Sequence, residues 1–370
     1  MEQKQPILIV GQSNLASTTG GAITVLRQFS AMLSGNGYQV LVTWYSNSPQ
    51  KPNWDIPGVS FRSVVPSKDA INSLVEESNP CLIVFFFPAL YLDAHLKKQF
   101  ASIPRILMFH SRPDYYFATF KGLEHRLKKY YINTHAQILL ESFRPLLPSY
   151  IRKGPVSVIP NGVKSPSVKA DLSVEHRKMV YFSRLDPNKG ADLAIEAMAT
   201  VKDRYPNWQL DIFGDFEPAS YRDTLQQLIK EKGVDNQVYL MGLSKRSAQD
   251  TLAEYDFCVF PSRFEGFSLG LAEAMASGLP CIGLNNASGV NECIVDGYNG
   301  LLCQDSPLAL ADSIIHLIEH PDKRREMGNN AAGWALQFNP EAIQAQWMTL
   351  IYRILHKDSH SILPVKELVK

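Results

Sequence analysis

The chain has 370 residues, of which 45% are hydrophobic, and this suits two domains of ordinary size that each bury a core. Charge is nearly balanced overall, with 37 Lys+Arg and 36 Asp+Glu. Residues 1–160, however, hold 16 basic and 9 acidic residues, whereas residues 161–370 hold 21 and 27. This asymmetry favours two domains with different roles. The composition excludes a disordered chain, and the basic excess is too small to indicate nucleic acid as a partner.

The sequence predicts neither a membrane span nor a secreted protein. The longest apolar run, residues 81–92, has 12 residues and a proline, against the roughly 20 needed to span a bilayer. The N-terminal segment lacks the pattern of a signal peptide. The cysteines are odd in number and form no Cys-x-x-Cys: Cys81, Cys258, Cys281, Cys293 and Cys303. We expect reduced thiols that fill the core of a cytoplasmic protein.

In the first half, short apolar runs alternate with a helical segment. We expect strands at residues 6–11, 38–44, 82–87, 105–109, 137–140 and 156–159. Residues 21–34 have the apolar spacing of a helix. Pro160-Asn161-Gly162 breaks the chain, and a polar stretch follows it. We therefore place the first domain at residues 1–163.

A second alternating series fills residues 164–339, the expected second domain. Predicted strands are residues 180–183, 209–213, 238–241, 257–260 and 281–284, and predicted helices are residues 191–204, 219–232, 268–277, 308–319 and 323–337. A last helix follows no strand, so residues 340–370 are expected to return to the first domain. Alternating strands and helices predict an α/β protein with two Rossmann-like, doubly wound domains that face each other across a cleft.

Three absences narrow the chemistry. The sequence has no Gly-Lys dipeptide, hence no P-loop, and no Gly-x-Gly-x-x-Gly dinucleotide fingerprint. It also lacks Asp-x-Asp, the short carboxylate clamp for a metal ion on a diphosphate. We therefore expect no bound metal.

Two loops after predicted strands suit an anionic ligand, because ligands of such sheets bind at the carboxyl ends of strands. Gly20 and Gly21 open the first helix, where free amides attract phosphate. Arg184 and Lys189 follow the strand at residues 180–183, and without a metal these cations could stabilise a departing diphosphate. The alternatives are a plain turn and two exposed bases.

The densest motif is SRFEGFSLGLAEAM at residues 262–275. Glu265 lies in its loop, and Glu273 lies about one turn inside the helix, where a carboxylate can accept two ribose hydroxyls. The amides of Phe267, Ser268 and Leu269 lie at the positive end of that helix and suit a phosphate. The alternative is two surface glutamates on an amphipathic helix.

Two further features belong to the first half. His110 ends the strand at residues 105–109, where it could position a sugar hydroxyl or stabilise charge. Residues 115–131 mix aromatic residues with Lys121, Arg126, Lys128 and Lys129, and residues 94–153 hold 11 basic and 3 acidic residues. This segment could rest on an anionic membrane surface, or it could be a solvated helix face.

Together these residues resemble glycosyltransferase family 4, the retaining nucleotide-sugar transferases of the GT-B fold. The resemblance covers nearly the whole chain. Its most specific part is Glu265-x7-Glu273, followed by DGYNGLL at residues 296–302. Supporting parts are PNGV at residues 160–163, Arg184 with Lys189-Gly190, and Gly20-Gly21.

The resemblance implies a retaining hexosyltransferase that uses a UDP- or GDP-sugar, needs no metal or other cofactor, and acts on a glycan or lipid-linked glycan in cell-envelope polysaccharide synthesis. It would work in the cytoplasm, peripherally at the inner membrane face. Glu265 and His110 would be catalytic. The donor would be bound by Gly20, Gly21, Arg184, Lys189, Phe267, Ser268, Leu269 and Glu273.

The sequence departs from the family pattern in two places and leaves two other functions open. Gly214-Asp215-Phe216 stands where the family has Gly-x-Gly, and Ser183 stands where Gly is usual. Residues 266–270, GFSLG, also match the nucleophile elbow of serine hydrolases, although five residues separate the match from its strand. A non-catalytic nucleotide-sugar-binding protein is the other alternative.

Overall fold

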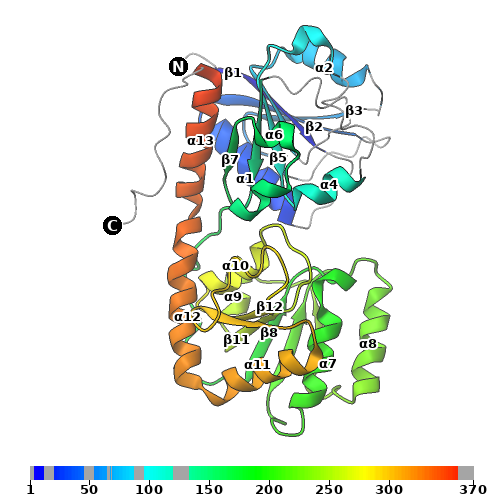
Figure 1. Cartoon of the computed structure of the whole chain (residues 1–370), viewed down its shortest axis with the longest axis vertical. Helices are drawn as coiled ribbons and strands as arrows, with labels where there is room; N and C mark the ends of the chain where they lie inside the picture. The colour runs from blue at the N-terminus through cyan, green and yellow to red at the C-terminus, as the bar shows by residue number, and fades with distance from the viewer. Residues whose placement is uncertain are drawn as a thin grey trace. The chain divides into compact units, whose positions relative to one another are not determined.

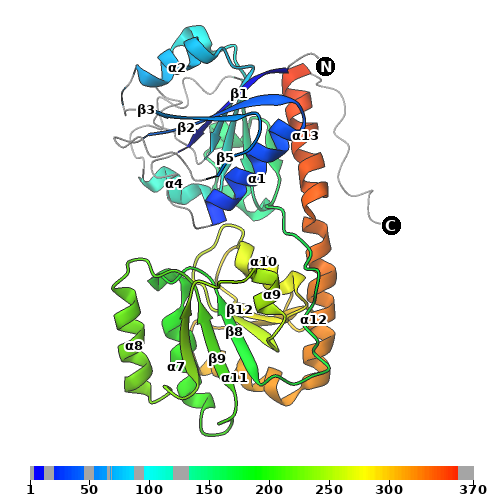
Figure 2. The ribbon, with the colours of Figure 1, turned by 180° about the vertical axis from the view of Figure 1, so that it is seen from behind.

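The structure is a computed structural model that describes residues 4–11, 21–45, 54–64, 67, 69–86, 96–119 and 133–356. The chain forms two compact units (Figures 1 and 2). Unit 1 comprises Met1–Ile159 and Glu341–Lys370, and unit 2 comprises Pro160–Pro340.

Unit 1 is built on a seven-stranded parallel sheet with the order β3-β2-β1-β4-β5-β6-β7. Its strands are β1 (Lys4–Gly11), β2 (Tyr38–Tyr45), β3 (Val59–Val64), β4 (Leu82–Phe86), β5 (Arg105–Phe109), β6 (Thr134–Ile138) and β7 (Val156–Val158). Its described helices are α1 (Gly21–Gly35), α2 (Ala70–Ser78), η1 (Lys98–Phe100), α4 (Pro113–Thr119), η2 (Glu141–Leu146) and α6 (Ser149–Arg152). Every residue of β4 and β5 is buried, as their continuous apolar runs predict.

The last helix, α13 (Pro340–His356), packs within unit 1. Trp347 of α13 meets Phe29 of α1 edge to face, with ring centroids 4.8 Å apart. Trp347 and Ile351 are buried, so the apolar stripe of this helix covers the fold that the chain left almost two hundred residues earlier. In Figure 1 the end of the coloured chain is thus found beside its beginning.

Unit 2 is built on a six-stranded parallel sheet with the order β10-β9-β8-β11-β12-β13. Its strands are β8 (Lys178–Phe182), β9 (Gln209–Phe213), β10 (Val238–Gly242), β11 (Phe257–Phe260), β12 (Cys281–Leu284) and β13 (Gly300–Cys303). Its helices are η3 (Pro187–Lys189), α7 (Ala191–Val201), α8 (Tyr221–Lys232), α9 (Ala248–Leu252), α10 (Leu269–Ala276), α11 (Pro307–Glu319), α12 (Pro321–Ala335) and η4 (Leu336–Phe338). Helix α7 packs against α8 and α11, and α10 packs against α9 and α12.

The sheets confirm the predicted class of two Rossmann-like α/β domains, but several short elements were missed and one was misplaced. The edge strand β3 alternates half-buried and exposed residues, so it has no continuous apolar run, and β13 and α9 are only four and five residues long. Helix α2 was not predicted either. The strand expected at residues 137–140 is β6, which begins at Thr134 and ends at Ile138. Its start was missed because Thr134 and His135 are polar and interrupt the apolar pattern.

All five cysteines are free thiols. Four are buried and Cys81 is half-buried, which confirms their role as core residues. In the part of the chain that the structure describes, no helix is long and apolar enough to cross a membrane.

Candidate active site

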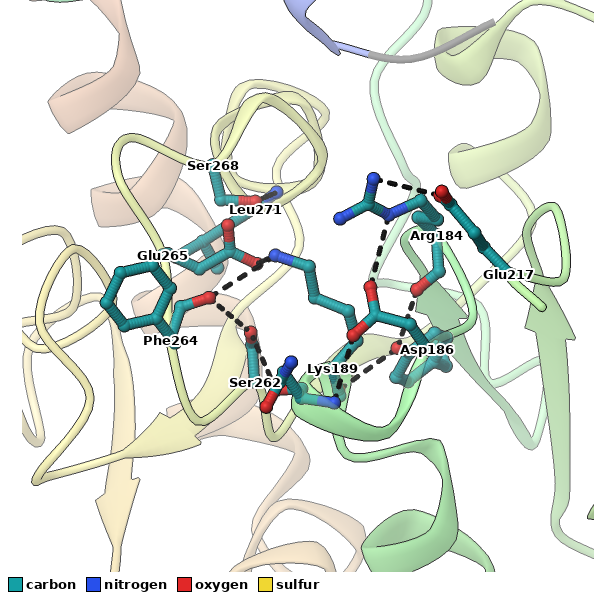
Figure 3. Close-up of polar contacts among 11 residues, drawn as sticks. Arg184, Asp186, Lys189, Glu217, Ser262, Phe264, Glu265, Ser268 and Leu271 are labelled. Carbon is teal, nitrogen blue, oxygen red and sulfur yellow. Dashed lines mark hydrogen bonds and ion pairs between the residues drawn. The ribbon is translucent and has the colours of Figure 1, made fainter. Parts of the chain in front are cut away.

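The candidate site lies where three neighbouring strands of unit 2 end. Because β9, β8 and β11 are adjacent and parallel, the loops that follow them meet at one edge of the sheet. Figure 3 shows this meeting: Arg184, Asp186 and Lys189 come from the loop after β8, Glu217 from the loop after β9, and Glu265 from the loop after β11.

Local sequence fixes the loop after β8. The carboxylate of Asp186 accepts a hydrogen bond from the backbone N–H of Asn188 at 3.0 Å and so caps the short helix η3. Gly190 follows with a φ of 73°, and a Cβ atom there would lie 2.1 Å from the carbonyl oxygen of Pro261. Only glycine satisfies both the left-handed backbone and this close approach to the loop after β11.

Lys189 and Glu265, separated by 76 positions in the sequence, form a buried ion pair (Figure 3). The Lys189 Nζ atom lies 2.8 Å from Glu265 Oε1, and the two side chains are only 14% and 9% exposed. The same Nζ atom donates to the carbonyl oxygen of Phe264 at 3.3 Å. The structure therefore brings a predicted donor-binding cation against a predicted catalytic carboxylate.

Arg184 has a different environment. Its side chain is 54% exposed and lies between two carboxylates, with Nε 3.1 Å from Asp186 Oδ2 and a terminal nitrogen 3.0 Å from Glu217 Oε2 (Figure 3). Sequence reasoning assigned no role to Glu217, which follows the Gly214-Asp215-Phe216 departure. Its only signal in the sequence is its position in a strand-to-helix loop.

The loop after β9 is also tied to the loop after β8 through the backbone. The N–H of Leu185 donates to Asp215 O at 2.8 Å, and the N–H of Glu217 donates to Leu185 O at 2.9 Å. The ring of Phe216 instead meets the guanidinium of Arg222, at 5.6 Å from its centroid. The residues that replace the family glycine pattern thus support the segment that carries Arg184.

Helix α10 begins with free backbone donors at the expected place. Ser268 is the N-cap, and its Oγ atom accepts from the N–H of Leu271 at 3.3 Å. No hydrogen bond among the described residues uses the amides of Phe267, Ser268 or Leu269. Such amides form an anion-binding site at the positive end of a helix.

The same geometry argues against the serine-hydrolase alternative. Ser268 has an ordinary extended backbone with a φ of −76°, seven residues separate it from the end of β11, and its hydroxyl is engaged in capping. A nucleophile elbow needs a strained turn directly after a strand. GFSLG here is the start of a helix.

Glu273 is a half-buried carboxylate inside α10. Burial raises the pKa of Glu273 from its ordinary 4.5 to about 7. Within the described ranges this carboxylate has neither an ion-pair partner nor a hydrogen bond. A carboxyl group whose pKa is raised by burial and that has no polar partner is a candidate for a ligand-binding group.

The remaining predicted site residues belong to unit 1 and are described with it. His110 follows β5, with its ring 4.1 Å from that of Phe86, and burial lowers its pKa to about 3. The imidazole is therefore neutral near pH 7 and is suited to hydrogen-bond a hydroxyl. Gly21 begins α1, whereas Gly20 lies outside the described residues.

Most of the basic and aromatic segment, residues 120–132, also lies outside the described part of the chain. Of its described residues, Tyr115 is exposed, whereas Tyr116 is buried with its ring 5.8 Å from that of Phe109. Tyr116 is thus a core residue of unit 1 rather than part of a membrane-facing surface.

Among the described residues no group of three or more His, Cys, Asp or Glu side chains could hold a metal ion. The sequence contains two His-x-x-x-His pairs, of which His356 and His360 extend beyond the described residues. His316 and His320 lie on and just after α11, and their ring centroids are 4.3 Å apart. Their neighbour Glu319 is bound instead by Arg204 and Tyr205. The pair therefore lacks a third ligand.

Comparison with known proteins supports the resemblance seen in the sequence. Residues 167–334 match the family of glycosyl transferases group 1. The chain is 33% identical over 183 residues to a D-inositol 3-phosphate glycosyltransferase of Corynebacterium glutamicum. The aligned region covers 47% of this chain and 43% of that protein. The chain is 30% identical over 204 residues to an exopolysaccharide phosphotransferase of Streptomyces coelicolor, which covers 55% and 21%. The chain spans less than half the length of these curated relatives.

Solved structures extend the likeness to the whole fold. Sucrose-phosphate synthase from Thermosynechococcus elongatus matches with a TM-score of 0.79 at 22% identity, over 96% of this chain and 100% of that one. Anabaena HepE, solved with UDP-glucose, matches with a TM-score of 0.74 at 21% identity, over 94% and 100%. The chain thus has the GT-B fold, and residues 167–334 match the group 1 glycosyltransferases, in agreement with the resemblance seen in the sequence.

Proposed function

We propose that this protein is a retaining glycosyltransferase that moves a hexose from a nucleotide diphosphate sugar to a glycan or lipid-linked glycan, without a bound metal. One observation carries the proposal: at one edge of the unit 2 sheet, the loop with Arg184 and Lys189 meets the loop that leads into α10, where three amides are open and Glu273 has no partner among the described residues. A nucleotide diphosphate sugar offers two anionic phosphates and two ribose hydroxyls to such a set.

Each group would serve a separate part of the donor. Glu273 would accept the two ribose hydroxyls, because a carboxylate has two acceptor oxygens. Arg184, Lys189 and the amides at Phe267–Leu269 would hold the diphosphate and stabilise the charge that grows on it as the bond to the sugar breaks. Glu265, kept in place by Lys189, would contact the sugar, and neutral His110 would hydrogen-bond a sugar or acceptor hydroxyl.

The first experiment is a donor screen. UDP-glucose, UDP-galactose, UDP-GlcNAc and GDP-mannose are compared by thermal shift and by release of free nucleotide, and NMR of the product gives the anomeric configuration. We expect one donor to raise the melting temperature and to release nucleotide with retention at the anomeric carbon. Binding without turnover, with acceptor extract supplied, would favour the non-catalytic alternative.

Metal independence needs its own test. It rests on the presence of Arg184 and Lys189 and on the absence of an Asp-x-Asp motif in the sequence. We expect turnover to persist in EDTA and to gain little from Mg²⁺ or Mn²⁺. Turnover that EDTA abolishes and Mg²⁺ restores would contradict the assignment of Arg184 and Lys189 as the groups that neutralise the leaving diphosphate.

We also propose that the acceptor is membrane-borne, on the basis of the basic excess over residues 94–153. Attraction to anionic lipid is worth about 1 kcal/mol per base near the surface and is screened by salt. Sedimentation with anionic and neutral vesicles, at low and high salt, tests this. The variant with Lys121, Arg126, Lys128 and Lys129 all changed to Glu is the control. Equal binding by the variant would leave a soluble acceptor as the better proposal.

A further inference from the structure

In the loop that carries both cations, every backbone carbonyl from residue 184 to residue 190 accepts a hydrogen bond. For five of the seven carbonyls from residue 184 to residue 190 the donor is a backbone amide or Arg263. These bonds are Glu217 N to Leu185 O at 2.9 Å, Lys189 N to Asp186 O at 2.9 Å, Arg263 Nη1 to Pro187 O at 2.8 Å, Arg263 N to Asn188 O at 2.8 Å and Ala194 N to Gly190 O at 3.1 Å.

The other two carbonyls belong to the two residues with cationic side chains, and both depend on one phenol. Tyr181 lies near the end of β8 and is fully buried. Its hydroxyl lies 3.0 Å from Lys189 O and 3.3 Å from Arg184 O, and it donates to both. A phenol has a single proton, so the two carbonyls share it and are held to one point.

Tyr181 is well suited to remain a donor. Burial and the nearby charge of Glu265 raise the pKa of Tyr181 well above its ordinary value, so the hydroxyl keeps its proton. A buried strand residue in an apolar run gives no signal in the sequence, and Tyr181 reads there as one more core side chain.

We propose that Tyr181 is the positioning residue that sets the spacing of the two donor-binding cations. The inference rests on the proposed function, in which Arg184 and Lys189 grip one diphosphate. Without the hydroxyl, these two part-buried carbonyls would lose their donor and would have to turn toward water or other amides. Since each carbonyl belongs to the backbone of a cation, Arg184 and Lys189 would move relative to each other.

Tyr181→Phe removes one oxygen and keeps the buried ring, and the chain offers a matched control. Tyr255 is also buried, and its hydroxyl donates to Asp211 at 2.7 Å, away from the cationic loop. Both variants are assayed by nucleotide release with the four donors named above, at a temperature where circular dichroism shows both folded. We expect Tyr181→Phe to lower kcat/KM by about 10- to 100-fold, since misplacement of binding groups by about 1 Å has effects of this size. Tyr255→Phe should stay within about twofold.

A double-mutant cycle separates positioning from a general loss of structure. If Tyr181 acts through the cations, Tyr181→Phe should cost at least about threefold less in an Arg184→Ala background than in the wild type, because half of what it positions is gone. An equal cost in both backgrounds, or a Tyr181→Phe variant within about twofold of wild type, would overturn the role of Tyr181 alone. A wild type that releases nucleotide from none of the four donors would overturn the proposed function, and this inference with it.

Discussion

The two ends of the loop after β8 carry cations that look equivalent in the sequence and differ in the structure. Lys189 is 14% exposed and is paired with Glu265, a carboxylate that is just as buried. Arg184 is 54% exposed, and its two carboxylate partners are Asp186 in the same loop and Glu217 in the loop after β9. The same proposed ligand thus meets one cation that is part of the folded interior and one that lies in solvent.

The difference teaches that burial, rather than residue type, decides what a charge does when no ligand is bound. Each charge of a buried ion pair has lost its hydration, and only its attraction to the opposite charge offsets that loss. Removing one member alone therefore destabilises the fold strongly. An exposed pair contributes about 0–1 kcal/mol, so its members are free to serve a ligand instead. We therefore expect Lys189 to matter for both stability and activity, and Arg184 for activity alone.

The largest effect should follow from Lys189→Ala. The change leaves Glu265 buried without its partner, and we expect the free energy of unfolding to fall by about 3–5 kcal/mol, together with loss of nucleotide release. Denaturant titration and the turnover assay measure the two effects.

A matched double variant separates those effects. Lys189→Met with Glu265→Gln removes both charges and should recover most of the unfolding free energy, while turnover stays lost. If the single variant is as stable as the wild type, Lys189 and Glu265 do not form the buried pair in solution.

Arg184→Ala tests the other end of the loop. It removes a charge-assisted contact to the diphosphate, worth about 2–4 kcal/mol in the transition state, so turnover should fall roughly 30- to 1000-fold. The free energy of unfolding should change by less than about 1 kcal/mol. Arg246→Ala is the control, because Arg246 is 48% exposed and pairs with Glu254 outside the site. Near-normal turnover of Arg184→Ala would make the diphosphate assignment wrong.

Much of this site could be predicted because its residues follow strands directly. Arg184, Lys189, Glu265 and Glu273 were proposed from the rule that ligands bind at strand ends and from the spacing of the motif at residues 262–275. The parallel order of β9, β8 and β11 then explains why loops far apart in the chain meet.

What the sequence could not show was pairing. Lys189 is paired with Glu265 because Gly190 lies close to Pro261, which brings the two loops together. That contact joins residues 71 positions apart in the sequence. Tyr181 and Glu217 were missed for related reasons, since one is hidden in an apolar strand and the other acts through a side chain from a neighbouring loop. Composition and periodicity describe single elements, whereas these contacts join elements.

Glu273 extends the comparison to a half-buried carboxyl group that has no partner among the described residues. Its pKa is raised from 4.5 to about 7, so the folded state holds this proton more tightly than the unfolded state does. Stability from this group is therefore fully present below pH 4.5 and is lost as pH rises through about 7, by about 3 kcal/mol at most. Glu273→Gln should raise the free energy of unfolding by about 1–3 kcal/mol at pH 8 and by little at pH 4.5.

The same variant should weaken donor binding, because an amide has only one acceptor oxygen for the two ribose hydroxyls. In the wild type, donor affinity should fall as pH decreases below about 7 and the carboxylate becomes protonated. Isothermal titration at pH 6 and pH 8 measures this. Affinity that is unchanged by both pH and the variant would remove Glu273 from the donor site, even if the stability result holds.

The smallest effect, from Glu217→Gln, decides what the exposed partners of Arg184 are for. Glu217 is 66% exposed and lies 3.0 Å from the Arg184 guanidinium, where a phosphate oxygen would otherwise bind. If Glu217 only occupies Arg184 until the donor arrives, its neutralisation should lower the donor KM by about two- to fivefold and leave kcat unchanged, as expected for a pair worth under about 1 kcal/mol. Because salt screens an exposed pair, the advantage should shrink at high ionic strength. A higher KM would instead mean that Glu217 holds Arg184 in its binding position, and the exposed cation would then resemble Lys189 in needing its partner.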